Sequence, residues 1–128
     1  MKKTIITALA TATILAGCSN SKTDAPADKT YGAYMIVKGE NYKAEDLGPY
    51  AASLPPIYAK YGGEYIAFTT KYDTLEGAEN AQAIIISGWP SVEAANEFWV
   101  SPDYREAIKL RENIGEFTVV VVPALAGK

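Results

Sequence analysis

The side chains that most often do acid–base and metal chemistry are scarce in this sequence. Histidine does not occur among its 128 residues, although it is the most frequent general acid–base and metal-binding residue of proteins. Histidine-ligated haem, an iron site of two histidines and one carboxylate, and a histidine-based triad are therefore excluded. The glycine pair Gly62-Gly63 ends an expected helix and does not follow a strand as a phosphate-binding loop would. We expect no cofactor.

Three carboxylates, Asp73, Glu76 and Glu79, fall in one polar stretch. Their oxygens could gather a calcium ion, but their spacing does not match that of a known calcium loop. A hydrated acidic loop fits the pattern better, and we expect no metal site.

Arg111 is the most informative charged residue. It falls within the otherwise apolar stripe of the last expected helix, so its guanidinium should point toward a sheet or a cleft. A buried arginine must be paired or must bind an anion. Two interpretations stay open: an ion pair with an acid such as Glu64 or Glu116, or an anchor for a carboxylate or enolate at the mouth of a helix–sheet pocket. Arg105 is expected to be a surface charge.

Aromatic residues are the remaining candidates for a site, since the chain has nine tyrosines and two tryptophans. Most buried tyrosines and tryptophans are packing residues whose polar atom finds a partner. With that alternative kept open, the candidate ligand-binding residues are Arg111, Tyr65, Trp89, Trp99 and Tyr104.

The stretch from Gly88 to Arg105 predicts how these residues are positioned. Pro90 ends a strand near Trp89, and Ser91 is an N-cap for a helix. Ser101-Pro102-Asp103 repeats the start pattern, so a second helix should follow the first after a break. Its stripe runs through Tyr104, Ile108, Arg111 and Ile114, and Gly115 should end it in the left-handed conformation.

The other elements follow from periodicity and from glycine and proline. Strands are expected at 31–37, 64–70, 81–87 and 116–122, and an amphipathic helix at 45–61. Pro55-Pro56 should kink that helix or restart it. The resulting order, βαββαβ, is that of a ferredoxin-like α+β sandwich. Because the strands are apolar on both faces, we expect a second copy to cover the open face of the sheet, giving a dimeric α/β barrel.

The first 17 residues have the pattern of an export signal. Lys2 and Lys3 precede an apolar run, residues 4–16, which is shorter than the ~20 residues that span a bilayer. Leu15-Ala16-Gly17-Cys18 closely resembles the lipobox of bacterial lipoproteins, in which the chain is cut before an acylated cysteine. The resemblance implies a signal peptide at 1–17 and a lipid on Cys18. That lipid would remove the single cysteine from thiol chemistry.

The mature chain would then have three parts. Cys18 and a small, polar, flexible tether make up residues 18–30, the folded domain spans 31–124, and a tail spans 125–128. Loss of Lys2 and Lys3 with the signal peptide would change the net charge from −3 to −5, and this charge with the lack of a basic patch excludes nucleic acid as a partner. Serine rather than aspartate at position 19 implies, for a Gram-negative cell, the periplasmic face of the outer membrane.

Several short motifs resemble the family of the domain of unknown function DUF1330, within the dimeric α/β-barrel superfamily. They stand in the family's order and spacing: Tyr61-Gly62-Gly63-Glu64-Tyr65, Glu76-Gly77, Trp89-Pro90-Ser91-Val92-Glu93-Ala94-Ala95, Ser101-Pro102-Asp103-Tyr104-Arg105, and Arg111. The resemblance covers residues 31–124 and departs at Trp89, where members commonly have phenylalanine. It implies architecture and a homodimer rather than a reaction.

The sequence thus predicts a membrane-anchored envelope lipoprotein whose domain binds a small, partly apolar ligand or a partner protein. The superfamily resemblance keeps an alternative open, a cofactor-independent enzyme similar to quinol monooxygenases or lactone isomerases. In such an enzyme an arginine or tyrosine would hold a developing oxyanion.

Overall fold

The computed structural model of the protein describes residues 29–126. The expected signal peptide at 1–17, Cys18 and most of the expected tether lie outside the described residues, as do residues 127 and 128. The elements, in chain order, are β1 (Ala33–Glu40), the 3-10 helix η1 (Ala44–Leu47), α1 (Gly48–Tyr61), β2 (Glu64–Thr69), β3 (Ala83–Trp89), α2 (Val92–Val100), α3 (Pro102–Lys109) and β4 (Glu116–Pro123). This order confirms the ferredoxin-like α+β fold.

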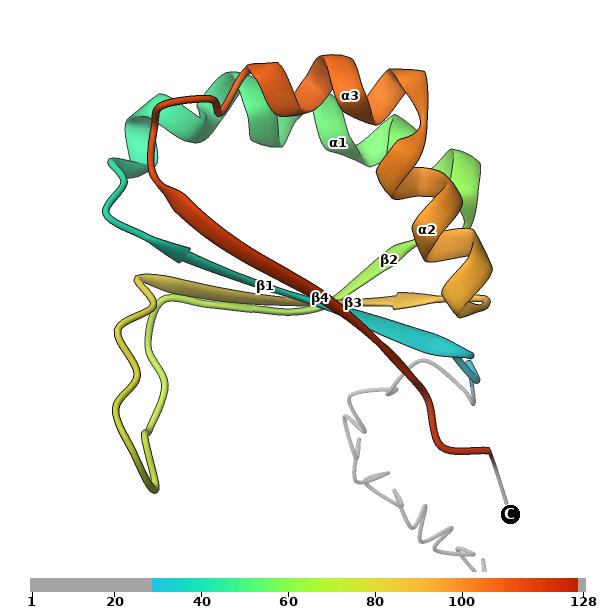
Figure 1. Cartoon of the computed structure of the whole chain (residues 1–128), viewed down its shortest axis with the longest axis horizontal. Helices are drawn as coiled ribbons and strands as arrows, with labels where there is room; N and C mark the ends of the chain where they lie inside the picture. Colours follow the sequence, from blue (N-terminus) through green and yellow to red (C-terminus); the bar gives the residue numbers. More distant parts are fainter. Residues whose placement is uncertain (1–28, 127–128) are drawn as a thin grey trace, which may run out of the picture.

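The four strands form one antiparallel sheet in the order β2-β3-β1-β4. The helices of residues 29–126 cover one face of this sheet, and no other element of the described chain covers the opposite face (Figure 1). The two layers therefore enclose the space in which a site can form, and the open face is available to a partner.

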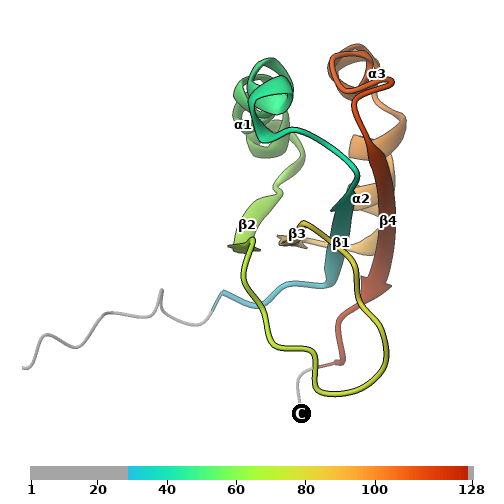
Figure 2. The ribbon, with the colours of Figure 1, turned by 90° about the vertical axis from the view of Figure 1, so that its left-hand side faces the viewer.

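The helical layer is not parallel to the sheet. Figure 2 shows α1 and α3 side by side above the sheet, while α2 descends toward it beside β4. Ser91 caps α2 by accepting a hydrogen bond from the amide of Ala94 at 3.0 Å, and Ser101 caps α3 by accepting one from the amide of Tyr104 at 3.2 Å. Both N-caps and the break between the two helices confirm the sequence prediction.

Pro55 and Pro56 do not divide α1, which runs unbroken from Gly48 to Tyr61. Both prolines lie on the exposed side of the helix. The carbonyls that lose an amide partner, those of Ala51 and Ala52, also belong to exposed residues and can therefore be hydrated. The helix ends at Gly62, whose φ of 77° gives the predicted left-handed C-cap.

The structure also differs from the sequence prediction at the end of α3. The helix ends at Lys109, so Arg111 lies in the following turn and not within the helix. The left-handed residue of this turn is Asn113, with a φ of 61°, and not Gly115. Glycine is needed at 115 for a different reason, because a Cβ there would lie 2.6 Å from Cβ of Tyr42 and 2.8 Å from the carbonyl oxygen of Glu40.

The core lies at the end of the sheet that α2 covers. Trp89, Phe98 and Met35 are almost completely buried there. The rings of Trp89 and Phe98 lie 4.7 Å apart, and Tyr58 of α1 packs 5.0 Å from the Trp89 ring. This cluster fixes the distance between the helices and the sheet at one end of the sheet only.

The open face of the sheet carries a row of apolar side chains across all four strands. Val120 pairs with Ile36, Ile36 with Ile86, and Ile86 with Ala67. Val120 is 45 % exposed. No helix in residues 29–126 has the length and the apolar run needed to cross a membrane.

Candidate functional site

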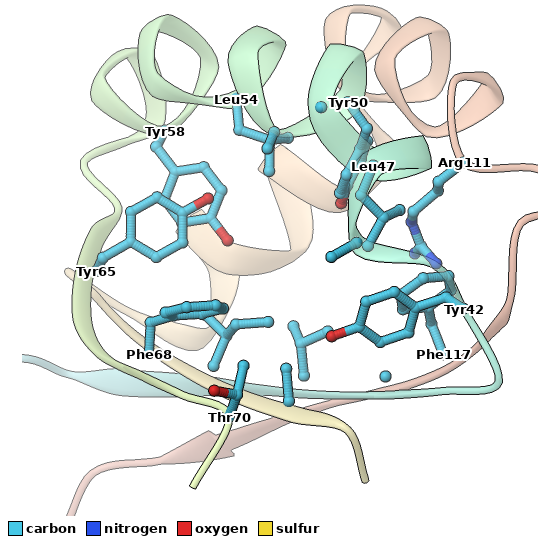
Figure 3. Close-up of a pocket in the computed structure, with 17 residues that line it drawn as sticks. Tyr42, Leu47, Tyr50, Leu54, Tyr58, Tyr65, Phe68, Thr70, Arg111 and Phe117 are labelled. Atoms are coloured by element: carbon cyan, nitrogen blue, oxygen red, sulfur yellow. The ribbon is translucent and has the colours of Figure 1, made fainter.

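A cavity of about 480 Å³ lies between α1 and the helix-facing side of the sheet. It is at the end away from the aromatic core, beneath η1 and the first turns of α1 (Figure 3). Its walls are aliphatic and aromatic for the most part, with Val37 and Ile85 from the sheet and Leu47 and Leu54 from the helical side. Arg111 is the one charged residue among the described residues that line it.

Arg111 closes one end of the cavity and is only 9 % exposed. Its guanidinium carbon lies 4.3 Å from the centre of the Phe117 ring and 5.3 Å from that of Tyr50. Its Nε atom is buried and has no hydrogen-bond partner among the described residues. Desolvated cation–π contacts contribute about 2 kcal/mol, which is less than the several kcal/mol that burying an unpaired ion costs.

The predicted ion pairs of Arg111 are absent from the described structure. Glu64 is held instead by Lys29 and by the hydroxyl of Tyr31, and Glu116 accepts a hydrogen bond from Nδ2 of Asn41 at 2.9 Å. Of the two interpretations left open by the sequence, an ion pair of Arg111 with Glu64 or Glu116 is wrong. A bound anion would neutralise the buried guanidinium of Arg111.

Tyrosine hydroxyls occupy the opposite end of the cavity. The rings of Tyr58 and Tyr65 stack 4.6 Å apart, and their hydroxyl ends point into the cavity (Figure 3). Burial raises the pKa of Tyr65 to about 12, although the residue is 49 % exposed, and burial also raises the pKa of Tyr58 and Tyr50. At neutral pH these groups are therefore protonated hydrogen-bond donors and not bases.

The five candidate residues from the sequence fall in different places. Arg111 and Tyr65 line the cavity. Tyr104 lies behind it, with its hydroxyl 3.1 Å from that of Tyr50. Trp89 is buried in the core, where its Nε1 donates to Ser87 Oγ at 3.0 Å. Trp99 packs on the far side of Tyr104, at 5.1 Å between ring centres.

Sequence reasoning missed five of the aromatic wall residues: Tyr42, Tyr50, Tyr58, Phe68 and Phe117. A pattern for two of them was present, because Tyr50, Leu54 and Tyr58 recur every four residues and must share one face of α1. Phe68 and Phe117 face the cavity from the two edge strands. The alternation of side chains along a strand shows which face they occupy, but not at which end of the sheet the helices stand far enough away to leave a cavity.

The family model of the domain of unknown function DUF1330 matches residues 32–125 of this chain. The chain belongs to the DUF1330 family. No curated protein matches this DUF1330 chain.

Solved structures show the same fold. A protein of unknown function from Rhodopseudomonas palustris superposes with a TM-score of 0.61 at 22% identity, covering 79% of this chain and 88% of that one. SnoaB, a cofactor-independent oxygenase from Streptomyces nogalater, superposes with a TM-score of 0.51 at 12% identity, covering 77% and 97%. A dimeric ferredoxin-like protein of unknown function from Thermobifida fusca has a TM-score of 0.51 at 13% identity, covering 75% and 93%.

The cavity of this DUF1330 domain combines apolar walls with a few polar groups. Its described lining offers a cation at one end and hydroxyl donors at the other, and it contains no carboxylate to act as a general base. Within residues 29–126, no three acidic or cysteine side chains gather closely enough to hold a metal ion. In the acidic loop, Glu79 pairs with Lys38.

Proposed function

We propose that this DUF1330 domain binds a small, largely apolar molecule in the cavity beneath α1, with a negatively charged oxygen of that molecule on Arg111. The observation that carries the proposal is the buried guanidinium at the end of an apolar cavity, with an Nε atom that no described residue satisfies. The cavity is within the size range of small-molecule sites, about 300–1,000 Å³, and such sites are mostly apolar with a few converging polar groups.

A cofactor-independent enzyme is the second candidate function. The fold that the chain shares with SnoaB and the presence of Arg111 and tyrosine hydroxyls in one cavity favour it, because either kind of donor could stabilise a developing oxyanion. Binding is the preferred proposal because the described lining supplies no side chain that accepts a proton at neutral pH.

A substitution at the mouth of the cavity tests the binding proposal. Ala51 is exposed on α1 and lines the cavity, whereas its neighbour Ala52 is equally exposed and does not. For the full chain in lipid nanodiscs, Ala51→Trp should weaken binding of 4-phenylbutyrate about tenfold or more because the indole closes the mouth. The measurement is isothermal titration calorimetry with empty nanodiscs as the blank.

Ala52→Trp is the matched control and should bind like the wild type. Equal affinities for all three proteins, or no binding by the wild type, would count against a ligand site beneath α1.

We also infer that the protein is a homodimer, with the open sheet faces of two copies packed on one another. The row of Val120, Ile36, Ile86 and Ala67 supports this inference, since a soluble domain rarely leaves such a surface uncovered. A dimeric relative of the same fold supports it as well. Each protomer would keep its own cavity, because the cavity is on the helix side of the sheet.

The proposed location is the cell envelope, with the domain tethered to a membrane by lipid on Cys18. In a Gram-negative cell Ser19 favours the periplasmic face of the outer membrane. Cys18→Ala should move most of the protein from the membrane fraction to the soluble fraction, since the acyl chains supply the anchoring energy. The check is fractionation followed by immunoblotting, with Ser21→Ala as control. Continued membrane association of Cys18→Ala would contradict the lipid anchor.

A further inference from the structure

A second, polar pocket of about 320 Å³ adjoins the turn that follows α3. Arg105 and Arg111 both line it, together with Glu112 and Asn113. Arg111 also lines the cavity beneath α1. One guanidinium therefore separates an apolar space from a polar one, and a ligand that contacts Arg111 from the cavity is adjacent to the second pocket.

Both arginines have hydrogen-bonding capacity that no described residue uses. Nε of Arg111 and both Nε and Nη2 of Arg105 are buried without a partner. The ion pairs formed by residues 29–126 all involve lysine, so neither guanidinium has a counter-ion among the described residues. Arg105 was expected to be a surface charge, but its side chain is half-buried.

The two guanidinium groups are held in place by aromatic rings. Arg105 lies 4.7 Å from the centre of the Trp99 ring and 5.2 Å from that of Tyr104. Arg111 lies over Tyr50 in the same way. The hydroxyls of Tyr50 and Tyr104 are 3.1 Å apart, which ties the ring under one arginine to the ring under the other. Stacking occupies the flat faces of the guanidinium groups and leaves their N–H edges for an oxyanion. Because the arginine side chains are already ordered, less side-chain entropy is lost when an oxyanion binds.

The charge of the pocket indicates which oxyanion it fits. Two arginines and the single acid Glu112 leave one net positive charge in its lining. The carbonyl end of α3 adds a partial negative charge nearby. A monoanion therefore neutralises the charge of the lining, whereas a phosphate dianion would leave an excess negative charge in the pocket. The planar fork of a guanidinium also matches the geometry of a carboxylate.

We propose that Arg105 and Arg111 together form a carboxylate site, and that the ligand of this domain is an amphipathic monocarboxylate whose apolar part occupies the cavity beneath α1. This inference rests on the proposed binding function and adds to it the chemical class of the ligand and the role of Arg105. Trp99 and Tyr104, which do not line the cavity, then act by positioning Arg105.

The test compares 4-phenylbutyrate with 4-phenylbutan-1-ol, which has the same apolar part and no charge. For the full chain in nanodiscs, calorimetry should show that the acid binds about tenfold or more tightly than the alcohol. Arg105→Met keeps the stem over the rings and removes the charge. It should weaken binding of the acid about tenfold and leave binding of the alcohol within about twofold. Lys109→Met, on the exposed side of α3, is the control and should change neither.

Each other outcome overturns the carboxylate site in a distinguishable way. Equal binding of acid and alcohol, with no effect of Arg105→Met, would refute it and leave the apolar ligand site standing. Acetate binding as tightly as 4-phenylbutyrate would show a site for free carboxylate ions that is not coupled to the cavity. Failure of the wild type to bind both phenyl compounds would remove the proposed function together with the carboxylate site.

Discussion

Val120→Glu is expected to convert the proposed homodimer into monomers. Val120 projects from the open face of the sheet, and its neighbours across the strands are Ile36 and then Ile86. A carboxylate there would be taken out of water without a partner when two such faces pack together, at a cost of several kcal/mol. Twofold symmetry places the substitution in both protomers, so the dimer should weaken at least about 100-fold.

The mass of the full chain in mild detergent, from light scattering corrected for detergent, measures this effect. Val100→Glu is the matched control, since Val100 is 69 % exposed at the end of α2 on the helical side. The account predicts a dimer for the wild type and for Val100→Glu and a folded monomer for Val120→Glu. A monomeric wild type would contradict the barrel, and a dimeric Val120→Glu protein would show that the interface lies elsewhere.

Trp89→Ala should cause the largest loss of stability of any single substitution in the core. The side chain is completely buried, packs against Tyr58 and Phe98, and donates to Ser87 Oγ. It also packs directly on the backbone of Gly63, where an added Cβ would lie 2.5 Å from the ring. Alanine leaves a cavity that these neighbours cannot fill, so the free energy of unfolding should fall by about 3–5 kcal/mol.

Urea unfolding followed by circular dichroism checks this value, with Trp99→Ala as the comparison. Trp99 is only partly buried, against Tyr104 and Arg105, and its loss should cost no more than about 2 kcal/mol. Equal losses for the two variants would mean that Trp89 is not the centre of the core.

The features that the sequence predicts well are those set by local chemistry. Ser91 and Ser101 cap their helices because a hydroxyl before a helix has few better uses than the free amides of the first turn. Gly62 takes a left-handed φ of 77° because the chain must leave α1 and other residues adopt that conformation with strain. From these caps and the strand periodicity the βαββαβ order follows without tertiary information.

The features that the sequence did not predict depend on how far the layers stand apart. Helical periodicity placed Arg111 on the apolar side of α3, and it is indeed buried, but the helix ends before it. Trp89 and Tyr65 both belong to strands that face the helices, yet only Tyr65 reaches the cavity. The difference arises because α2 packs closely on one end of the sheet while α1 and α3 bridge over the other (Figure 1). No pattern within a single element encodes that separation.

The most direct test of the central claim is a methyl NMR titration of the full chain in nanodiscs with 4-phenylbutyrate. The account predicts that the largest shifts fall on Leu47, Leu54, Val37 and Ile85, which line the cavity, and that Ala51→Trp requires about tenfold or more ligand to reach the same shifts. Shifts gathered instead on Val120, Ile36 and Ile86, on the open face of the sheet, would contradict a ligand site beneath α1.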